Sequence, residues 1–220
     1  LNHLRHLKVK TVKIDRSFVK SMLDNPNDYA IVDGVISLAD TFHRQVIAEG
    51  VETTEHGLML LIMGCDNAQG YGISPPMPAE QFPHWMNSYQ PNPEWIKCGN
   101  NILSLKSRRL KLFKLITNQW IGQFKKTIHS SPENITSWPT MKQTQCHCGT
   151  WIKRSRKENI FDESDLNDLD QAHKDMHRVA AELKEIYLDD DIEYARSGVK
   201  KLESTLDELI QINMLNKDSV

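Results

Sequence analysis

The sequence predicts an α/β unit followed by an all-α unit. In residues 1–87, short apolar or β-branched stretches alternate with segments whose apolar residues recur every three or four positions. This alternation is typical of βαβ units and a parallel sheet. Two prolines and an asparagine in Tyr89–Glu94 mark a boundary, because they neither continue a helix nor pair in a sheet. Beyond this boundary only the helical period remains.

The first half contains three predicted strands and three predicted helices. The strands are Lys10–Ile14, Gln45–Val51 and Asn67–Ile73, and the helices are Tyr29–Thr41, Glu55–Met63 and Ala79–Asn87. Three βα units cannot close a barrel, and an open sheet leaves its edges unpaired, so we expect further strands upstream. We also expect a C-terminal piece of a longer soluble protein, because the chain opens with Leu1 inside an amphipathic pattern.

The second half is predicted to form a helical bundle. One apolar helical face is marked by Phe113, Ile116, Trp120, Phe124 and Ile128. The Ser, Thr, Pro and Asn content of His129–Gln145 predicts a loop, and Asp165–Asp189 is predicted to be a second helix. The last segment carries a heptad stripe, which favours pairing of helices. Its members are Ile192, Ala195, Val199, Leu202, Leu206 and Leu209.

Composition excludes several classes of function. A net charge of −2 gives no general reason to expect nucleic-acid binding. The chain has no signal peptide and no apolar run of about 18 residues, so we expect no membrane span and a cytoplasmic protein. The four cysteines form no secreted-type framework. Cys146 and Cys148 are close together and near histidines, which favours a metal site or reduced thiols over a disulfide.

Three strings in the first half carry polar residues that strand alternation points inward. VKIDRSFV contains Lys13, VIAEGVET contains Glu49, and NAQGYGISPPMP contains Gln69. Because alternate strand residues share a face, Asp15 faces the same way as Lys13. A lysine, a carboxylate and an amide converging from consecutive strands suit the binding and cleavage of a phosphodiester.

In residue identity, order and spacing these strings resemble the EAL domain, a cyclic-di-GMP phosphodiesterase that folds as a TIM-like barrel. The resemblance implies that residues 1–90 are the C-terminal half of such a barrel, its last three βα units. In these units the strings end at the carboxyl ends of the strands, the face of the barrel where barrel enzymes have their active sites.

The resemblance also assigns roles to five residues. It implies that Lys13 orients the nucleophile and stabilises developing negative charge, and that Glu49 binds a metal or accepts a proton from the attacking water. Glu52 is implied to support Glu49. Gln69 and Asp15 are implied to be substrate-binding residues. Gln69 would hydrogen-bond near the substrate or its water, and Asp15, which faces the same way as Lys13, could pair with it.

The family's other metal ligands are the glutamate of the E-A-L string, an asparagine, another glutamate and an Asp-Asp pair, all expected upstream. Because two cations, Mg²⁺ or Mn²⁺, need several oxygen ligands, we expect this chain alone to be inactive. We expect its parent to hydrolyse cyclic di-GMP. The alternative is a catalytically degenerate parent that binds cyclic di-GMP as an effector and uses its helices to dimerise.

A second set of residues suggests a metal site in the helical half. His173 and His177 are four apart and therefore share one helical face, and Cys146, on a separate loop, adds a thiolate. Together they supply three of the four tetrahedral positions on zinc. The strings CHCGTW and HKDMH resemble the CZB domain, a chemoreceptor zinc-binding bundle. The resemblance implies that residues 108–216 form this bundle after a linker at 91–107.

Two residues depart from the pattern of that family. Thr117 stands where its first histidine is expected, and Cys148 replaces an apolar residue. The fourth ligand is then open to water, His129, His147 or Cys148. A bundle that has lost zinc and keeps only its dimer-forming helices, with Cys148 as a small core residue, is the alternative.

These expectations combine into one hypothesis about the whole protein. The bundle would sense zinc or its oxidation and pass the change to the barrel across a homodimer, through the helix Ile192–Leu209. The expected partners are cyclic di-GMP and a second copy of the chain.

Overall fold

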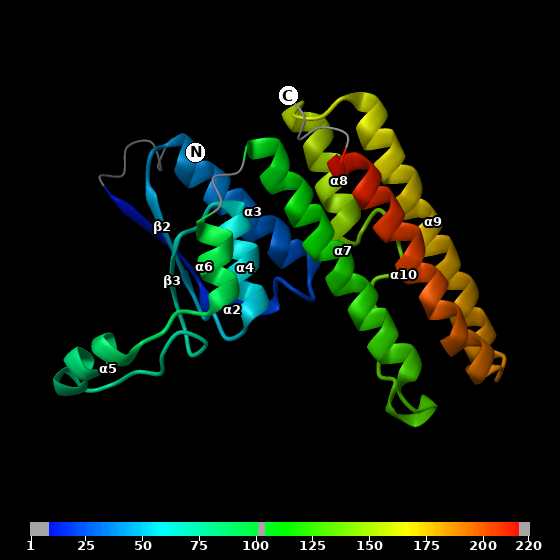
Figure 1. The fold of residues 1–220 in the computed structure, drawn as a ribbon, viewed down its shortest axis with the longest axis horizontal. Helices are drawn as coiled ribbons and strands as arrows, with labels where there is room; N and C mark the ends of the chain where they lie inside the picture. The colour runs from blue at the N-terminus through cyan, green and yellow to red at the C-terminus, as the bar shows by residue number, and fades with distance from the viewer. Residues whose placement is uncertain (1–8, 101–103, 216–220) are drawn as a thin grey trace. The chain divides into compact units, whose positions relative to one another are not determined.

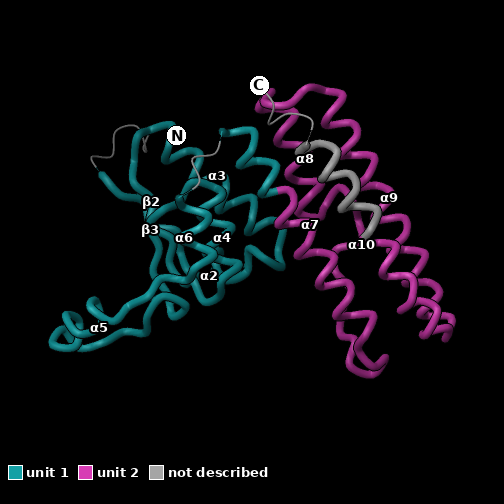
Figure 2. Tube along the Cα trace, viewed as in Figure 1, with its two compact units in different colours: residues 1–112 teal, residues 113–220 magenta. Residues whose placement is uncertain are grey.

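The computed structural model describes residues 9–100 and 104–215, with side chains as far as Glu203. Figure 1 shows the fold, and Figure 2 shows its two compact units, residues 1–112 (unit 1) and 113–220 (unit 2). Unit 1 contains β1 (Thr11–Ile14), α2 (Arg16–Ser21), α3 (Pro26–Thr41), β2 (Gln45–Glu49), α4 (Thr54–Met63), β3 (Asn67–Gln69), η1 (Ala79–Gln81), α5 (Phe82–Ser88) and α6 (Pro93–Gly99). Next come α7 (Leu105–His129), inside which the units divide, η2 (Pro132–Asn134), α8 (His147–Glu158), α9 (Glu163–Leu188) and α10 (Ile192–Leu215). None of the described helices is long and apolar enough to cross a bilayer.

The three strands form one parallel sheet in the order β1-β2-β3, which confirms the α/β prediction for the first half. The closed TIM-like barrel remains a prediction. Strands β2 and β3 are shorter than predicted. The backbone of Gly50 takes a left-handed conformation (φ 85°), and the N–H groups of Gly50 and Val51 both donate to the carbonyl of Gln69. This turn ends the ladder.

The two faces of the sheet differ in polarity. Ile14 and Ala48 are paired neighbours on one face and are buried beneath helices that include α3, which contacts both β1 and β2. Figure 1 shows these helices on one side of the strands. Lys13, Glu49 and Gln69 lie on the other face, as the alternation predicted.

Helix α2 was not predicted, and Asp15 explains where it begins. The Asp15 carboxylate accepts hydrogen bonds from the backbone N–H of Ser17 at 2.8 Å and from the Ser17 hydroxyl at 2.6 Å. A carboxylate at this position satisfies a backbone N–H that has no partner within the helix.

Helix α6 lies within the stretch predicted to be a linker, and it packs on α4. The indole N–H of Trp95 donates to the carbonyl of Thr54 at 2.9 Å. A side chain at Gly57 would overlap the Trp95 ring, so glycine permits this close approach. The start of α6 has a proline in its first turn and a cap from Asn92, a signal that was available in the sequence.

Unit 2 confirms the predicted apolar face on α7. All five predicted side chains are buried, and none is more than 2% exposed: Phe113, Ile116, Trp120, Phe124 and Ile128. Helices α9 and α10 pack along one another, with Gly198 against the side chain of Leu183. Helix α9 begins two residues earlier than predicted and ends one residue earlier.

The heptad stripe lies on α10 as predicted, as far as its side chains are described. Ala195, Val199 and Leu202 are buried, whereas Ile192 is half-buried. The predicted members Leu206 and Leu209 lie outside the described side chains.

Candidate functional sites

The first candidate site is a strand-end cluster formed by Lys13, Glu49 and Gln69. Glu49 and Gln69 are the last residues of β2 and β3 and face each other in the ladder. The Lys13 ammonium forms an ion pair with the Glu49 carboxylate, and the Gln69 amide donates to the same carboxylate at 3.4 Å. The structure therefore brings together the three residues that the sequence singled out from three separate strands.

The strand-end cluster is open. The Lys13 side chain is 57% exposed and that of Glu49 is 24% exposed. Its ammonium and amide groups are donors that match phosphate oxygens, and its carboxylate is an acceptor that suits a hard cation. In the described part of the chain, no group of three potential metal-ligating side chains gathers here.

Asp15 and Glu52, the other two predicted residues, are bound elsewhere. Asp15 caps α2, and the hydrogen bonds from Ser17 lower the pKa of its carboxyl group. The expected pairing of Asp15 with Lys13 is absent from the described ion pairs, because Ser17 holds one carboxylate and Glu49 holds the ammonium. Glu52 accepts a hydrogen bond from Lys20 of α2 at 3.2 Å.

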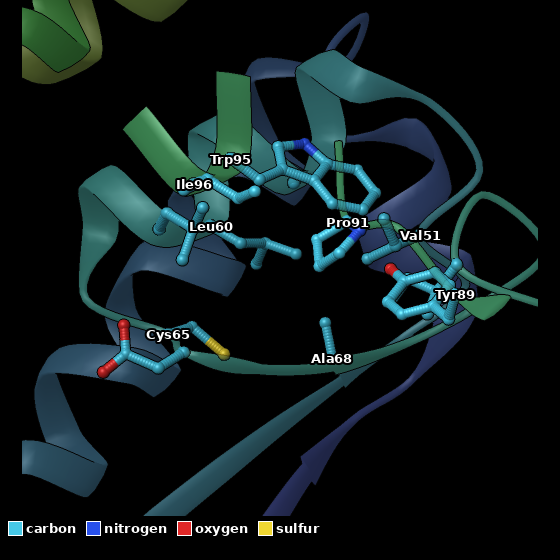
Figure 3. A pocket seen from close by; sticks show the side chains of 12 residues that line it. Val51, Leu60, Cys65, Ala68, Tyr89, Pro91, Trp95 and Ile96 are labelled. Atoms are coloured by element: carbon cyan, nitrogen blue, oxygen red, sulfur yellow. The ribbon is translucent and has the colours of Figure 1, made fainter. Parts of the chain in front are cut away.

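An apolar pocket of about 290 Å³ lies elsewhere in unit 1 (Figure 3). Its walls come from α4, α6 and the segments around β3, with Leu60, Trp95 and Ile96 facing Ala68. Ala68 is the ladder partner of buried Ala48, so this pocket is on the helix-covered face of the sheet. It offers burial for an apolar group, and none of the strand-end cluster lines it.

The second candidate site is the Cys/His cluster of unit 2. The Cys146 sulfur lies 3.0 Å from Nε2 of His173 and 3.4 Å from Nε2 of His177. The two histidines are one turn apart on α9, as predicted, and Cys146 is the residue just before α8. All three residues are at most 5% exposed.

The spacing of these donor atoms fits a tetrahedral zinc ion. Zn–S and Zn–N bonds of about 2.3 and 2.0–2.1 Å at tetrahedral angles place sulfur and nitrogen about 3.5 Å apart. The observed separations are 3.0 and 3.4 Å, with both Nε2 atoms directed at one sulfur. A sulfur and two imidazole nitrogens are also the donor types that zinc prefers.

Hydrogen bonds and burial set the protonation of the two neighbouring thiols. The hydrogen bond from Cys148 is the main cause of a strongly lowered pKa at Cys146, and hydrogen bonds from His173 and His177 add to it. Burial is the main cause of the raised pKa of Cys148. A thiolate at Cys146 therefore lies beside a protonated thiol at Cys148.

The loop and helices around the cluster hold Cys146 in place. The backbone N–H of Gly149 donates to the Cys146 sulfur at 3.3 Å. A Cβ atom at Gly149 would lie 2.0 Å from the carbonyl oxygen of Gln143, so only glycine fits between the loop and α8. The Trp120 ring contacts the ring of His177, with 4.6 Å between centroids.

Sequence reasoning missed helix α8, although Cys146 does lie on a loop, just before this helix, as predicted. The helical signal was present in Trp151, Ile152 and Ser155, which are buried and spaced as one helical face. Two of the candidate fourth ligands differ in their position relative to the Cys/His cluster. His129 is exposed at the end of α7, where its Nδ1 lies 2.9 Å from the carbonyl of Lys125, whereas Cys148 is buried in the cluster.

Comparison with known families finds a match for each half of the chain. Residues 1–76 match the EAL domain, and residues 118–184 match the chemoreceptor zinc-binding domain. The chain carries part of an EAL domain and a zinc-binding domain of the chemoreceptor type. The zinc-binding match contains both the Cys146 string and the histidine pair of α9.

Several curated relatives match part of this chain. The oxygen sensor protein DosP of Escherichia coli is 41% identical over 41% of the chain and 11% of the relative. In Pseudomonas aeruginosa, the bifunctional diguanylate cyclase/cyclic di-GMP phosphodiesterase MucR is 38% identical over 37% of the chain and 12% of the relative. The cyclic di-GMP phosphodiesterase RocR of the same organism is 35% identical over 37% of the chain and 21% of the relative. The chain thus spans between about a tenth and a fifth of these relatives, and the matches support a signalling protein.

Proposed function

We propose that this chain supplies one wall of the cyclic-di-GMP site of an EAL phosphodiesterase, together with a zinc-binding bundle that regulates hydrolysis. The observation that carries the proposal is the pair of domain matches on one chain, each containing a cluster of suitable side chains. The phosphodiesterase relatives support the choice of substrate.

In the barrel, the strand-end cluster would contact the phosphodiester. The Lys13 ammonium and the Gln69 amide would donate to phosphate oxygens and favour the charge that develops during attack. The half-buried Glu49 carboxylate fits as one ligand of Mg²⁺ or Mn²⁺, a cation that lowers the pKa of a bound water. Other parts of the barrel would complete its coordination, so this chain alone would be inactive.

In the bundle, Cys146, His173 and His177 would hold zinc between the start of α8 and the middle of α9. Because a closed structural zinc site contributes to folding, zinc binding would fasten these two helices together. Helix α10 packs along α9 and would carry the change across a homodimer to the barrel.

The test is hydrolysis of cyclic di-GMP by the full-length protein in excess Mg²⁺, before and after a zinc-selective chelator. We expect the rate to change on zinc removal and to recover on zinc addition. The matched variant Cys146→Ala should no longer respond to the chelator. An unchanged rate in the wild type would contradict regulation by zinc.

The same experiment separates hydrolysis from simple binding. We expect Lys13→Ala to lower the rate of hydrolysis far more than the affinity for cyclic di-GMP. A full-length protein that binds cyclic di-GMP and shows no hydrolysis with either Mg²⁺ or Mn²⁺ would instead be a binding effector.

A further inference from the structure

Cys148 lies at the point where the zinc site lacks a ligand. The donor atoms of Cys146, Cys148 and His173 all lie within 4.8 Å of one another. The hydroxyl oxygen of Thr117 is 3.1 Å from the Cys148 sulfur. A residue at position 117 therefore points at the same corner of the cluster that Cys148 fills.

Thr117 itself is engaged by its own helix. Its hydroxyl donates to the carbonyl of Phe113 at 2.7 Å, and the same oxygen lies 3.1 Å from the Cys148 sulfur. A neutral hydroxyl is also absent from the usual set of zinc ligands, which are sulfur, imidazole nitrogen and carboxylate oxygen. Thr117 thus supports Cys148 and offers no ligand of its own.

Charge balance favours a second thiolate in this place. Among the described residues of unit 2, no Asp or Glu side chain is buried. Zinc held by one thiolate and neutral ligands would leave a net positive charge in this buried cluster, which is costly in an apolar interior. Two thiolates and two neutral imidazoles bring the net charge of the site to zero.

We propose that Cys148 is the fourth zinc ligand and replaces the histidine that position 117 lacks. The site would then hold zinc through Cys146, Cys148, His173 and His177. This inference rests on the proposed zinc-binding function. On binding, the Cys148 thiol would release its proton to solvent and its sulfur would bond to the metal. Tetrahedral geometry requires the two sulfurs to be about 3.8 Å apart. The sulfurs of Cys146 and Cys148 lie within 4.8 Å of one another, which is compatible with that separation.

The test is X-ray absorption at the zinc edge on the zinc-loaded chain. We expect two sulfur neighbours at about 2.3 Å and two nitrogen neighbours at about 2.0–2.1 Å. A single sulfur neighbour in the wild type would overturn the assignment of Cys148 and leave zinc binding intact. Wild-type protein that binds no zinc at all would overturn both this inference and the zinc-binding function.

Variants at positions 148 and 117 test whether Cys148 takes the place of the missing histidine. We expect Cys148→Ala to retain one sulfur neighbour and to bind zinc at least about 10-fold more weakly, whereas Cys98→Ala should match the wild type. Thr117→His combined with Cys148→Ala should recover affinity with one sulfur and three nitrogens. Unchanged affinity in Cys148→Ala, or loss of affinity in His147→Ala alone, would overturn the proposal. Circular dichroism of each variant checks that the helices are retained.

Discussion

The strand-end cluster and the Cys/His cluster use polar side chains in opposite ways. Lys13 and Glu49 meet on an exposed sheet face, and their contact is an ion pair largely open to water. Cys146 and its two histidines are buried, and the Nε2 atoms of both histidines lie within 3.4 Å of the Cys146 sulfur. The first cluster is a surface that other groups must complete, whereas the donor atoms of the second all come from this chain and are buried.

The difference has an energetic basis. An exposed ion pair contributes little to stability because water screens it and its side chains lose entropy. Buried polar groups cost free energy unless they are satisfied by partners or by a metal. Nδ1 of His177, for example, is buried with no hydrogen-bond partner in the described structure. We therefore expect changes in the Cys/His cluster to affect both binding and stability, and changes in the strand-end cluster to affect function alone.

The largest effect is expected for Cys146→Ala. This change removes the sulfur on which both imidazoles converge, so zinc affinity should fall by at least about 100-fold, beyond the usual effect of a change outside the ligands. Zinc content per chain, measured by mass spectrometry of metals, should fall from about one to near zero. Cys98→Ala, a half-buried cysteine of unit 1, is the control. Equal zinc content in Cys146→Ala and the wild type would contradict the assignment of Cys146 as a zinc ligand.

The second effect concerns the backbone beside Cys146. Gly149→Ala should destabilise unit 2 by about 1–3 kcal/mol, because its Cβ would meet the Gln143 carbonyl oxygen. Gly122→Ala is the matched control, since Gly122 is at an exposed position of α7 and no atom lies within 4 Å of its Cβ position. It should be neutral or stabilising by up to about 1 kcal/mol. Urea unfolding measures both variants, and equal midpoints would contradict the role of Gly149.

A smaller effect is expected for Lys13→Ala. The loss of an exposed ion pair should change the free energy of unfolding by less than about 1 kcal/mol. Thermal unfolding of this chain measures that change. A loss of several degrees in melting temperature would show that the strand-end cluster is structural and would weaken the contrast between the two clusters.

A dependence of stability on pH is also expected in metal-free protein. The pKa of Cys146 is lower in the folded chain than its ordinary value of 9.0. Its thiolate therefore contributes stability that is complete above pH 9.0 and is lost as the pH falls toward the folded pKa. The stability difference between wild type and Cys146→Ser, followed by urea unfolding, should shrink as the pH falls. A difference that grows in acid would contradict the hydrogen bonds assigned to this sulfur.

Periodicity in the sequence predicted much of this architecture. The 3.6-residue spacing from Phe113 to Ile128 and the period-2 placement of Lys13 against Ile14 were confirmed, because burial of one face imposes these repeats on a helix and on a strand. Short helices were missed, since α2 and α6 depend on local caps at Asp15 and Asn92 more than on a long apolar stripe.

The candidate sites were predictable in part. Residue type and spacing identified Glu49 and the histidine pair as candidate site residues. Spacing alone does not predict which partner a charged side chain will contact. Asp15 binds Ser17, and Glu52 binds Lys20. The contact between Thr117 and Cys148 joins residues far apart in the sequence, and it emerged only from the packing of α7 against the start of α8.

The position of Cys146 gives the metal a direct connection to the backbone. Its sulfur accepts the N–H of Gly149 in the first turn of α8, so the atom expected to bind zinc also serves as the cap of a helix. A bound metal would withdraw electron density from that acceptor, and loss of the metal would return it. The amide proton of Gly149 is thus a spectroscopic reporter built into the chain, whose chemical shift would record whether the site is filled.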